Sequence, residues 1–319
     1  MTPLLRIEGL RLSIRTDAGV ACVLDDISLS LEAGRVLGVV GESGCGKSTL
    51  VRAILGILPR AARVDDGRIM FEGEDLLAFS ERELNDTVRS SRIGFIPQDP
   101  YLALNPVFRV GTQMLEIMRP HAAGSVAKHR ARLVHLLRRM RLPDPEGALD
   151  RYPRQFSGGQ RQRLLIAAAL ACAPRLVIAD EPTTALDVTT QHEILLLLRE
   201  LVDEFGISLL FVTHDFGVVA ALCDELAVIY AGQTVETGPA RQVLSVPSHP
   251  YTSALLACHP ERAAGFVGIP GSVPSPLAAP PGCRFAPRCP HARPCCRDRV
   301  SHLVPADAGQ VAVNCVLFE

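Results

Sequence analysis

The sequence lacks an excess of charge of either sign. Its 33 Lys and Arg residues against 34 Asp and Glu residues give a formal net charge of −1 over 319 residues. A generic nucleic-acid binder needs a strongly basic surface to release counterions, so the overall charge indicates no nucleic-acid partner. With 48% apolar residues the chain can bury a large hydrophobic core, and disorder is not its default state. Partners therefore have to be inferred from sites.

The chain also lacks a long uncharged apolar segment. Its longest apolar run, residues 164–174, lies between Arg163 and Arg175 and is much shorter than the roughly 20 residues that span a bilayer. Near the N-terminus, Arg6 and Glu8 interrupt the apolar residues where a signal peptide has a continuous apolar core. We therefore expect a chain that stays in the cytoplasm and does not itself cross the membrane.

Apolar runs and helical segments alternate over much of the sequence. Near the N-terminus, residues 4–14 and 21–31 alternate apolar with polar positions and predict antiparallel strands. Three short apolar runs are typical of buried parallel strands: 36–40, 176–179 and 208–213. Two amphipathic segments predict helices: 49–58 and 190–205. The pattern predicts an α/β fold, in which helices cover a mostly parallel sheet and an antiparallel β-subdomain precedes it.

From about residue 81 to about residue 170 the helical period dominates, which predicts an inserted helical subdomain. Residues 129–142 show the period most clearly, because Leu133, Leu137 and Met140 share one face. The same segment carries five arginines: Arg130, Arg132, Arg138, Arg139 and Arg141. Such a run could be a nucleic-acid or membrane patch, but a solvated helix face is more common and is our interpretation.

A glycine-rich turn between a predicted strand and helix carries a phosphate-binding motif. Residues 41–48, GESGCGKS, fit G-x-x-x-x-G-K-[ST] in the strand, loop and helix context that the motif requires. Backbone N–H groups can surround phosphates there, Lys47 reaches the β- and γ-phosphates, and Ser48 can bind Mg²⁺. Cys45 is expected to be a small filler, with an activated thiol as the alternative. The predicted nucleotide-binding residues are Gly41, Ser43, Gly44, Cys45, Gly46, Lys47, Ser48 and Thr49.

A second motif is an apolar strand that ends in two carboxylates, LVIADEP at residues 176–182. At the C-terminal edge of a phosphate-binding sheet, one carboxylate can hold Mg²⁺ while the other takes a proton from the attacking water. We assign Asp180 to the metal and Glu181 to the general base. A lone strand ending in Asp-Glu is more often a solvated strand end, so the assignment depends on the neighbouring motifs.

The third motif, FSGGQRQR at residues 156–163, precedes the two carboxylates and indicates a family. Here the sequence resembles the ATP-binding cassette (ABC) ATPases. The resemblance extends to Gln98 in GFIPQDP, Asp187 in TTALD and His214 in FVTHD, in the order and spacing of that family. It implies a P-loop ABC ATPase fold with ATP and Mg²⁺ as cofactors.

The same resemblance implies a role for each matching residue. Gln98 is implied to contact Mg²⁺ and the water and to follow movements of a transmembrane partner. His214 is implied to contact the γ-phosphate, and Asp187 to link two ATP sites. The turn of Ser157, Gly158 and Gly159 leads into a helix, presents N–H groups and a hydroxyl to an anion, and is implied to face ATP held by another subunit. The functional unit is then a dimer of ATPases.

The C-terminal part of the chain is rich in Pro, Gly and Cys. Residues 249–252 (HPYT), 269–274 (IPGSVP) and 282–290 (GCRFAPRCP) resemble the C-terminal extension of oligopeptide, dipeptide and nickel importer ATPases. We expect an ABC ATPase domain over residues 1–246 and a separate, small Cys-rich extension over residues 247–319. The resemblance implies the ATP-hydrolysing subunit of an importer, peripheral at the cytoplasmic face of the inner membrane. Its implied partners are two permeases, a second ATPase that is a sibling or an identical copy, and indirectly an extracytoplasmic binding protein.

Four cysteines of this extension have the spacing C-x5-C-x6-C followed by a distant fourth: Cys283, Cys289, Cys296 and Cys315. A cytoplasmic protein should not hold them as disulfides. The spacing is not the short paired type of zinc fingers, and the resemblance implies a [4Fe–4S] cluster, with zinc and reduced thiols as alternatives. Cys295 is adjacent to Cys296, and the spacing favours Cys296 as the third ligand.

A soluble ABC ATPase that acts on nucleic acid or ribosomes is the alternative function. Such proteins usually carry two cassettes or large insertions, whereas this chain has one signature motif and the importer-type extension. The family commonly stacks an aromatic ring on adenine, but no Phe, Tyr or Trp precedes Phe71, so the adenine contact is not predicted. The ATPase motifs do not distinguish peptide from nickel or other metal complexes as the cargo.

Overall fold

The computed structural model describes residues 3–184, 186–258, 268–298, 302–306 and 310–319. The chain divides into two units. Unit 1 comprises Met1–Leu77 and Val212–Glu319, so that it contains both ends of the chain. Unit 2 comprises Ala78–Phe211 and is a continuous insertion into unit 1.

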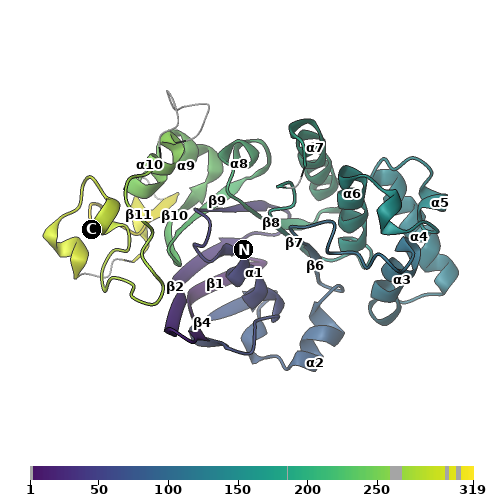
Figure 1. Ribbon diagram of the computed structural model, residues 1–319, viewed down its shortest axis with the longest axis horizontal. Helices are drawn as coiled ribbons and strands as arrows, with labels where there is room; N and C mark the ends of the chain where they lie inside the picture. The colour runs from purple at the N-terminus through teal and green to yellow at the C-terminus, as the bar shows by residue number, and fades with distance from the viewer. Residues whose placement is uncertain (1–2, 185, 259–267, 299–301, 307–309) are drawn as a thin grey trace. The chain divides into compact units, whose positions relative to one another are not determined.

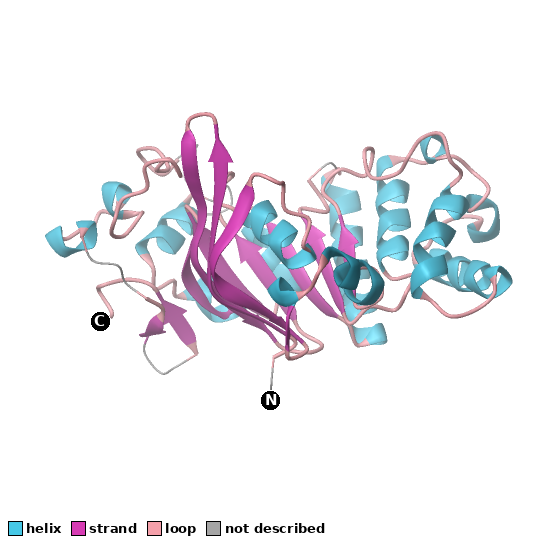
Figure 2. Cartoon of the chain, turned by 90° about the horizontal axis from the view of Figure 1, so that it is seen from below, coloured by secondary structure: helices cyan, strands magenta, loops and turns pink. Residues whose placement is uncertain are grey.

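Unit 1 contains an antiparallel sheet with the strand order β2-β1-β4-β5 (Figure 2). Its strands are β1 (Leu5–Thr16), β2 (Gly19–Leu31), β4 (Ala62–Phe71) and β5 (Glu74–Asp75). The register of β1 on β2 shifts between Ile7 and Leu10, which marks a β-bulge. Because the bulge changes which residues point to each face of the sheet, the side chains of Ile7 and Leu10 are both buried although they are three positions apart. The predicted antiparallel β-subdomain is confirmed.

A second group of strands in unit 1 has the order β11-β12-β10-β9-β3. These strands are β3 (Val36–Val40), β9 (Glu225–Tyr230), β10 (Gln233–Pro239), β11 (Val304–Ala306) and β12 (Val311–Val313). β3 pairs with β9 in parallel, and the other pairs are antiparallel. The helices of this unit are α1 (Lys47–Leu55), α8 (Phe216–Leu222), α9 (Ala240–Ser245) and α10 (Pro250–Ala257). The predicted extent of α1 is wrong by three residues at its end, because Gly56 adopts φ 66° and caps the helix.

The C-terminal extension packs into unit 1 together with the strands that precede it. β12 pairs with β10 of the ATPase domain, with Val313 opposite Glu236 (Figure 1). Phe285 and Val313 belong to the same buried cluster as Val228 and Tyr230. The extension therefore completes a core that it shares with the preceding strands, although its Pro-, Gly- and Cys-rich composition differs from theirs.

Unit 2 contains three strands in the order β8-β7-β6, namely β6 (Ile93–Ile96), β7 (Leu176–Asp180) and β8 (Ser208–Thr213), whose last two residues belong to unit 1. Its helices are α2 (Glu81–Glu83), α3 (Val110–His121), α4 (Val126–Arg139), α5 (Pro145–Ala148), α6 (Gly158–Ala169) and α7 (Val188–Phe205). β6 is parallel to β7 and lies inside the region predicted as helical. The helix predicted to reach residue 142 ends at Arg139, since Arg141 adopts φ 55°.

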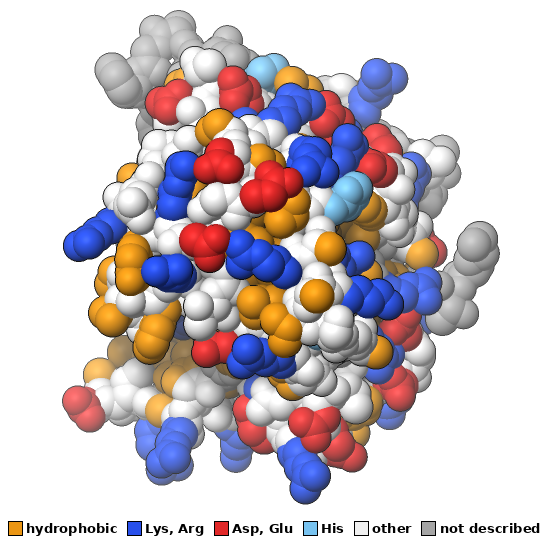
Figure 3. All heavy atoms as spheres, turned by 90° about the vertical axis from the view of Figure 1, so that its right-hand side faces the viewer, with side chains coloured by type: hydrophobic (Ala, Val, Ile, Leu, Met, Phe, Trp, Pro, Cys, Tyr) orange, Lys and Arg blue, Asp and Glu red, His pale blue; other side chains and the backbone are white. Residues whose placement is uncertain are grey.

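The arginines of α4 and the following turn are paired with acids or carbonyls, as a solvated helix face requires. Four of them form ion pairs: Arg130 with Asp150, Arg138 with Glu146, Arg139 with Glu204, and Arg141 with Glu200. Arg132 donates to the carbonyls of Leu170 and Ala171. Basic and acidic side chains are interspersed on the face over α3, α4 and α5 (Figure 3). Within the described ranges, no helix combines the length and apolarity needed to span a bilayer.

Candidate functional site

The phosphate-binding motif forms the turn from β3 into α1 in unit 1. Gly46 precedes the helix with φ 106°, a conformation that side chains disfavour. A Cβ atom on Gly41 would lie 2.1 Å from the carbonyl oxygen of Ile229, so only glycine fits there. Ser43 and Gly44 are exposed at the tip of the loop, and Ser48 and Thr49 lie in the first turn of α1. The loop thus directs its backbone N–H groups and a helix N-terminus to one place.

Lys47 is the cation of this loop, and its residue exposure is only 6%. Its Nζ donates to the carbonyl oxygens of Gly41 at 2.8 Å and Glu42 at 3.2 Å, both within the loop. The ammonium group is therefore held over the turn by backbone acceptors. Burial raises the pKa of the neighbouring Cys45, which favours its role as a small filler over an activated thiol.

The two carboxylates lie at the end of β7 in unit 2 and have different surroundings. Asp180 is the last strand residue and is buried, with 8% exposure. Glu181 adopts φ 47°, a strained conformation for a residue other than glycine. Its Oε2 accepts from Nε2 of Gln98 at 3.1 Å and from the Thr184 hydroxyl at 3.3 Å. The structure thus brings together the predicted base and Gln98, which follows β6.

The signature turn and Asp187 are also neighbours in unit 2. Ser157 is the exposed N-cap of α6, and its Oγ accepts from the N–H of Gln160 at 3.3 Å. Asp187 caps α7 and accepts from the N–H and the hydroxyl of Thr190, which lower the pKa of its carboxyl. A Cβ atom on Gly159 would lie 2.7 Å from Cγ2 of the same Thr190. Two helix N-termini are therefore packed closely through Gly159.

The remaining predicted residue of the ATP site, His214, is exposed and follows β8. It belongs to unit 1, as does the phosphate loop. Asp215 caps α8 by accepting from the N–H of Gly217 at 2.7 Å. This cap fixes the start of the helix that follows His214.

The four spaced cysteines of the extension all line one small cavity: Cys283, Cys289, Cys296 and Cys315. Cys295 is exposed and does not line it, while His249 and His291 do. Burial raises the pKa of Cys283, Cys289 and Cys315. Among the described residues, no group of three or more His, Cys, Asp or Glu side chains is arranged to hold a metal ion, so the predicted metal is not confirmed.

Three contacts near the site are not predicted by the sequence. Thr184 holds Glu181, Tyr251 accepts from the N–H of Glu42, and Arg288 pairs with the Glu42 carboxylate. Tyr251 lies in the HPYT segment and Arg288 in the GCRFAPRCP segment, and both segments carry the resemblance to the importer-type extension. That resemblance is the one signal in the sequence that points to these two residues. However, no periodicity or spacing indicates that residues so distant in the sequence meet the phosphate loop.

Two family models match the chain. The ABC transporter model matches residues 24–184, and the model of the oligopeptide/dipeptide transporter C-terminal region matches residues 235–296. The first covers the phosphate loop, the signature turn and both carboxylates, and the second covers three of the cavity cysteines.

The chain is also similar to known ATP-binding proteins and solved cassettes. It is 45% identical to the oligopeptide transport ATP-binding protein OppD of Salmonella typhimurium, over 92% of this chain and 88% of that protein. It is 43% identical to the probable peptide ABC transporter ATP-binding protein y4tR of Sinorhizobium fredii, over 97% of this chain and 93% of that protein.

Among solved structures, the ADP- and Pi-bound dimer of the cassette MJ0796 has a TM-score of 0.64 and 26% identity, and covers 74% of this chain and 99% of its own. CbiO1 from Clostridium perfringens has a TM-score of 0.66 and 28% identity, and the match covers 77% of this chain and 92% of CbiO1. The predicted P-loop ABC ATPase fold is thereby confirmed. The chain belongs to the ATP-binding proteins of ABC transporters, in the oligopeptide/dipeptide family.

Proposed function

We propose that this chain is the ATP-hydrolysing subunit of an ABC importer for oligopeptides. The observation that carries the proposal is the similarity to oligopeptide transport ATP-binding proteins over 92% of the chain, including the extension. The relatives described above have peptide-transport names, so peptide is the proposed cargo, rather than nickel or another metal complex. A nucleic-acid or ribosomal function has no comparable support, because the arginines of α4 are already paired.

The proposed roles of the ATP-site residues follow from their chemistry and from the resemblance to the ABC ATPases. Lys47 and the loop N–H groups bind the phosphates, while Ser48 and Asp180 hold Mg²⁺. Glu181 takes the proton of the attacking water, and Gln98, which donates to Glu181, positions that carboxylate and contacts Mg²⁺ and the water.

The signature residues are proposed to act across a dimer. The exposed Ser157, with Gly158 and Gly159, faces ATP bound by a second ATPase, and Asp187 links the two sites. The N-terminus of the 12-residue α6 favours this anion contact. His214 contacts the γ-phosphate. The dimeric MJ0796 cassette supports this arrangement, with an identical copy or a sibling as the second ATPase.

The permease contact is proposed to lie around Gln98 and on the helical subdomain, residues 81–170. The segment after Gln98 exposes four large apolar side chains: Tyr101, Leu102, Val107 and Phe108. Docking there places the chain peripherally at the cytoplasmic face of the inner membrane, with a binding protein on the far side. We keep residues 1–246 and 247–319 as the proposed ATPase domain and extension, although they share a core.

Co-purification tests the importer function directly. The tagged chain, at native expression, is purified anaerobically from detergent-solubilised membranes, and its partners are identified by mass spectrometry. Two multi-span permeases are expected, with or without a second ATPase, and an oligopeptide-binding protein encoded nearby identifies the cargo. Recovery only with ribosomal or nucleic-acid partners would overturn the proposal.

The cysteine cavity is proposed to hold a [4Fe–4S] cluster. Support comes from the resemblance of the extension to those of importer ATPases, and from the four thiols that line one cavity, none of which is in a disulfide. Bound iron would also stabilise the thiolate forms, which burial alone disfavours.

Metal analysis of the anaerobically purified chain distinguishes the alternatives. We expect about four iron and four sulfide per chain, as the cluster composition requires. Cys289→Ser and Cys296→Ser should lower the iron content, while the matched control Cys295→Ser should not, because Cys295 does not line the cavity. Stoichiometric zinc without sulfide, or four titratable thiols without metal, would contradict the cluster.

A further inference from the structure

The C-terminal extension contacts the phosphate loop at Glu42. The guanidinium of Arg288 forms a two-pronged pair with the Glu42 carboxylate, from Nη1 to Oε2 at 2.8 Å and from Nη2 to Oε1 at 3.2 Å. The two residues are 246 positions apart, and both belong to unit 1. Bidentate arginine–carboxylate pairs are strong and fix the orientation of both partners.

Arg288 is held rigidly by its other contacts. Besides the two bonds to Glu42, it donates to the Tyr230 hydroxyl at 3.2 Å and to the carbonyls of Pro270 and Ile269, both at 3.0 Å. These five bonds match the five N–H donors of a guanidinium. Its side chain is only 4% exposed, so Glu42 is paired with a preorganised and largely desolvated cation.

The backbone of Glu42 is fixed as well as its side chain. Its N–H donates to the Tyr251 hydroxyl at 3.0 Å, and its carbonyl accepts from Nζ of Lys47 at 3.2 Å. Tyr251 is buried and packs against Tyr230, with ring centroids 4.5 Å apart. The same carbonyl also accepts from the N–H of Cys45 at 3.2 Å. The second residue of the phosphate loop is thus held by two groups of the loop and two from the C-terminal part of the chain.

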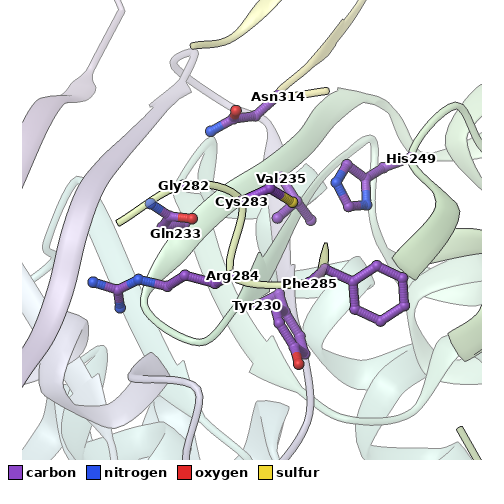
Figure 4. A pocket seen from close by; sticks show the side chains of 9 residues that line it. All are labelled: Tyr230, Gln233, Val235, His249, Gly282, Cys283, Arg284, Phe285 and Asn314. Atoms are coloured by element: carbon purple, nitrogen blue, oxygen red, sulfur yellow. The ribbon is translucent and has the colours of Figure 1, made fainter. Parts of the chain in front are cut away.

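A second arginine of the same segment supports the loop indirectly. Arg284 donates to the carbonyl of Ala231 and pairs with Asp25 at 2.8 Å. The next residue, Gly232, donates its N–H to the carbonyl of Cys45 in the loop at 2.9 Å. Between the two arginines, Phe285 lies against Tyr230 with ring centroids 5.2 Å apart, and Figure 4 shows Arg284 extending away from this pair. Residues 284–288 therefore contact the phosphate loop directly at Glu42 and indirectly through Ala231 and Gly232.

We propose that Arg288 is a positioning residue for ATP binding, which neutralises the Glu42 carboxylate and fixes the phosphate loop from the C-terminal extension. Glu42 is a negative charge within a loop that binds a triphosphate, and without its partner this charge repels the nucleotide. ATP affinity therefore depends on the extension. This inference rests on the proposed ATP site and is independent of the peptide cargo.

A double-mutant cycle on the full chain tests the proposal. The dissociation constant of N-methylanthraniloyl-ATP is measured by fluorescence for wild type, Arg288→Met, Glu42→Gln and the double variant. For Arg288→Met we expect the dissociation constant to rise about tenfold, which corresponds to the loss of one charge-assisted hydrogen bond. The double variant should recover most of the affinity, because the unpaired carboxylate is gone. In the ATPase assay, KM should rise while kcat at saturating ATP stays nearly constant.

The control is Arg63→Met, which removes an exposed arginine paired with Asp65 on β4 and should leave the affinity unchanged. If Arg288→Met does not fold, Arg288→Lys serves as the second variant. It keeps the positive charge but not the planar, bidentate guanidinium, and should raise the dissociation constant about threefold. An unchanged affinity in the folded Arg288 variant, or no recovery in the double variant, would overturn the proposal. Failure of the wild-type chain to bind the probe would instead refute the ATP site itself.

Discussion

Replacing Glu181 by glutamine is expected to lower kcat by about 10²- to 10⁴-fold, the usual contribution of a general base, while ATP binding is retained. Glutamine keeps the size of the side chain and its acceptor oxygen, so the bonds from Gln98 and Thr184 can persist. It cannot accept the proton of the attacking water. Phosphate release and nucleotide binding, measured on the same preparation, separate the two effects.

The positions of the two carboxylates support the choice of Glu181 over Asp180. Asp180 is buried at the end of β7, whereas the positive φ of Glu181 turns its side chain out of the strand register toward Gln98. A strained residue at a strand end is common at catalytic positions, because the surrounding structure stabilises an otherwise unfavourable conformation.

The matched control for this variant is Glu204→Gln. Glu204 lies on α7 in the same unit, where it pairs with Arg139 at the surface. Removing this exposed charge should change kcat little, since surface ion pairs contribute little to stability. Normal hydrolysis by the Glu181 variant would remove Glu181 from the role of base.

The sequence predicts the strands at the sheet centre well and the helix ends poorly. Residues 36–40 and 208–213 coincide with β3 and β8, because short, mostly apolar runs that contain β-branched residues and are bounded by turn signals are typical of buried strands. β6 has only four residues, IGFI, between two helical patterns, and is not predicted. Helix ends depend on single residues in the left-handed region, such as Gly56 and Arg141, which periodicity does not detect.

The site is predictable where chemistry requires a residue type at a fixed spacing. The phosphate loop, the Asp-Glu pair and the signature turn are contiguous motifs, so their residues can be identified before the fold is known. The contacts of Glu42 with Tyr251 and Arg288 depend on the shared core of the extension and the ATPase domain. Such contacts between distant positions are fixed by tertiary packing, and one sequence contains no direct signal for them.

Replacing Lys47 by alanine is expected to weaken ATP binding by about 100-fold or more, since the loss of a charge-assisted contact of about 3 kcal/mol corresponds to that factor. The ammonium is buried and bonded to Gly41 and Glu42, so the variant also removes one hydrogen bond from each of two loop carbonyls. Lys47→Arg should not restore affinity, because a planar guanidinium does not fit a loop that surrounds a compact cation. Dissociation constants from nucleotide titration of the full chain measure both effects.

The sequence offers a matched control, because its only other lysine is Lys128. Lys128 is exposed on α4, and its contribution to the Ser125 cap is made by its backbone N–H, which alanine keeps. Lys128→Ala should therefore bind ATP like the wild type. The Lys47 and Glu181 variants should fail at different steps, because the first binds ATP weakly and the second binds it with slow turnover. An unchanged dissociation constant in Lys47→Ala would contradict the assignment of the phosphate loop.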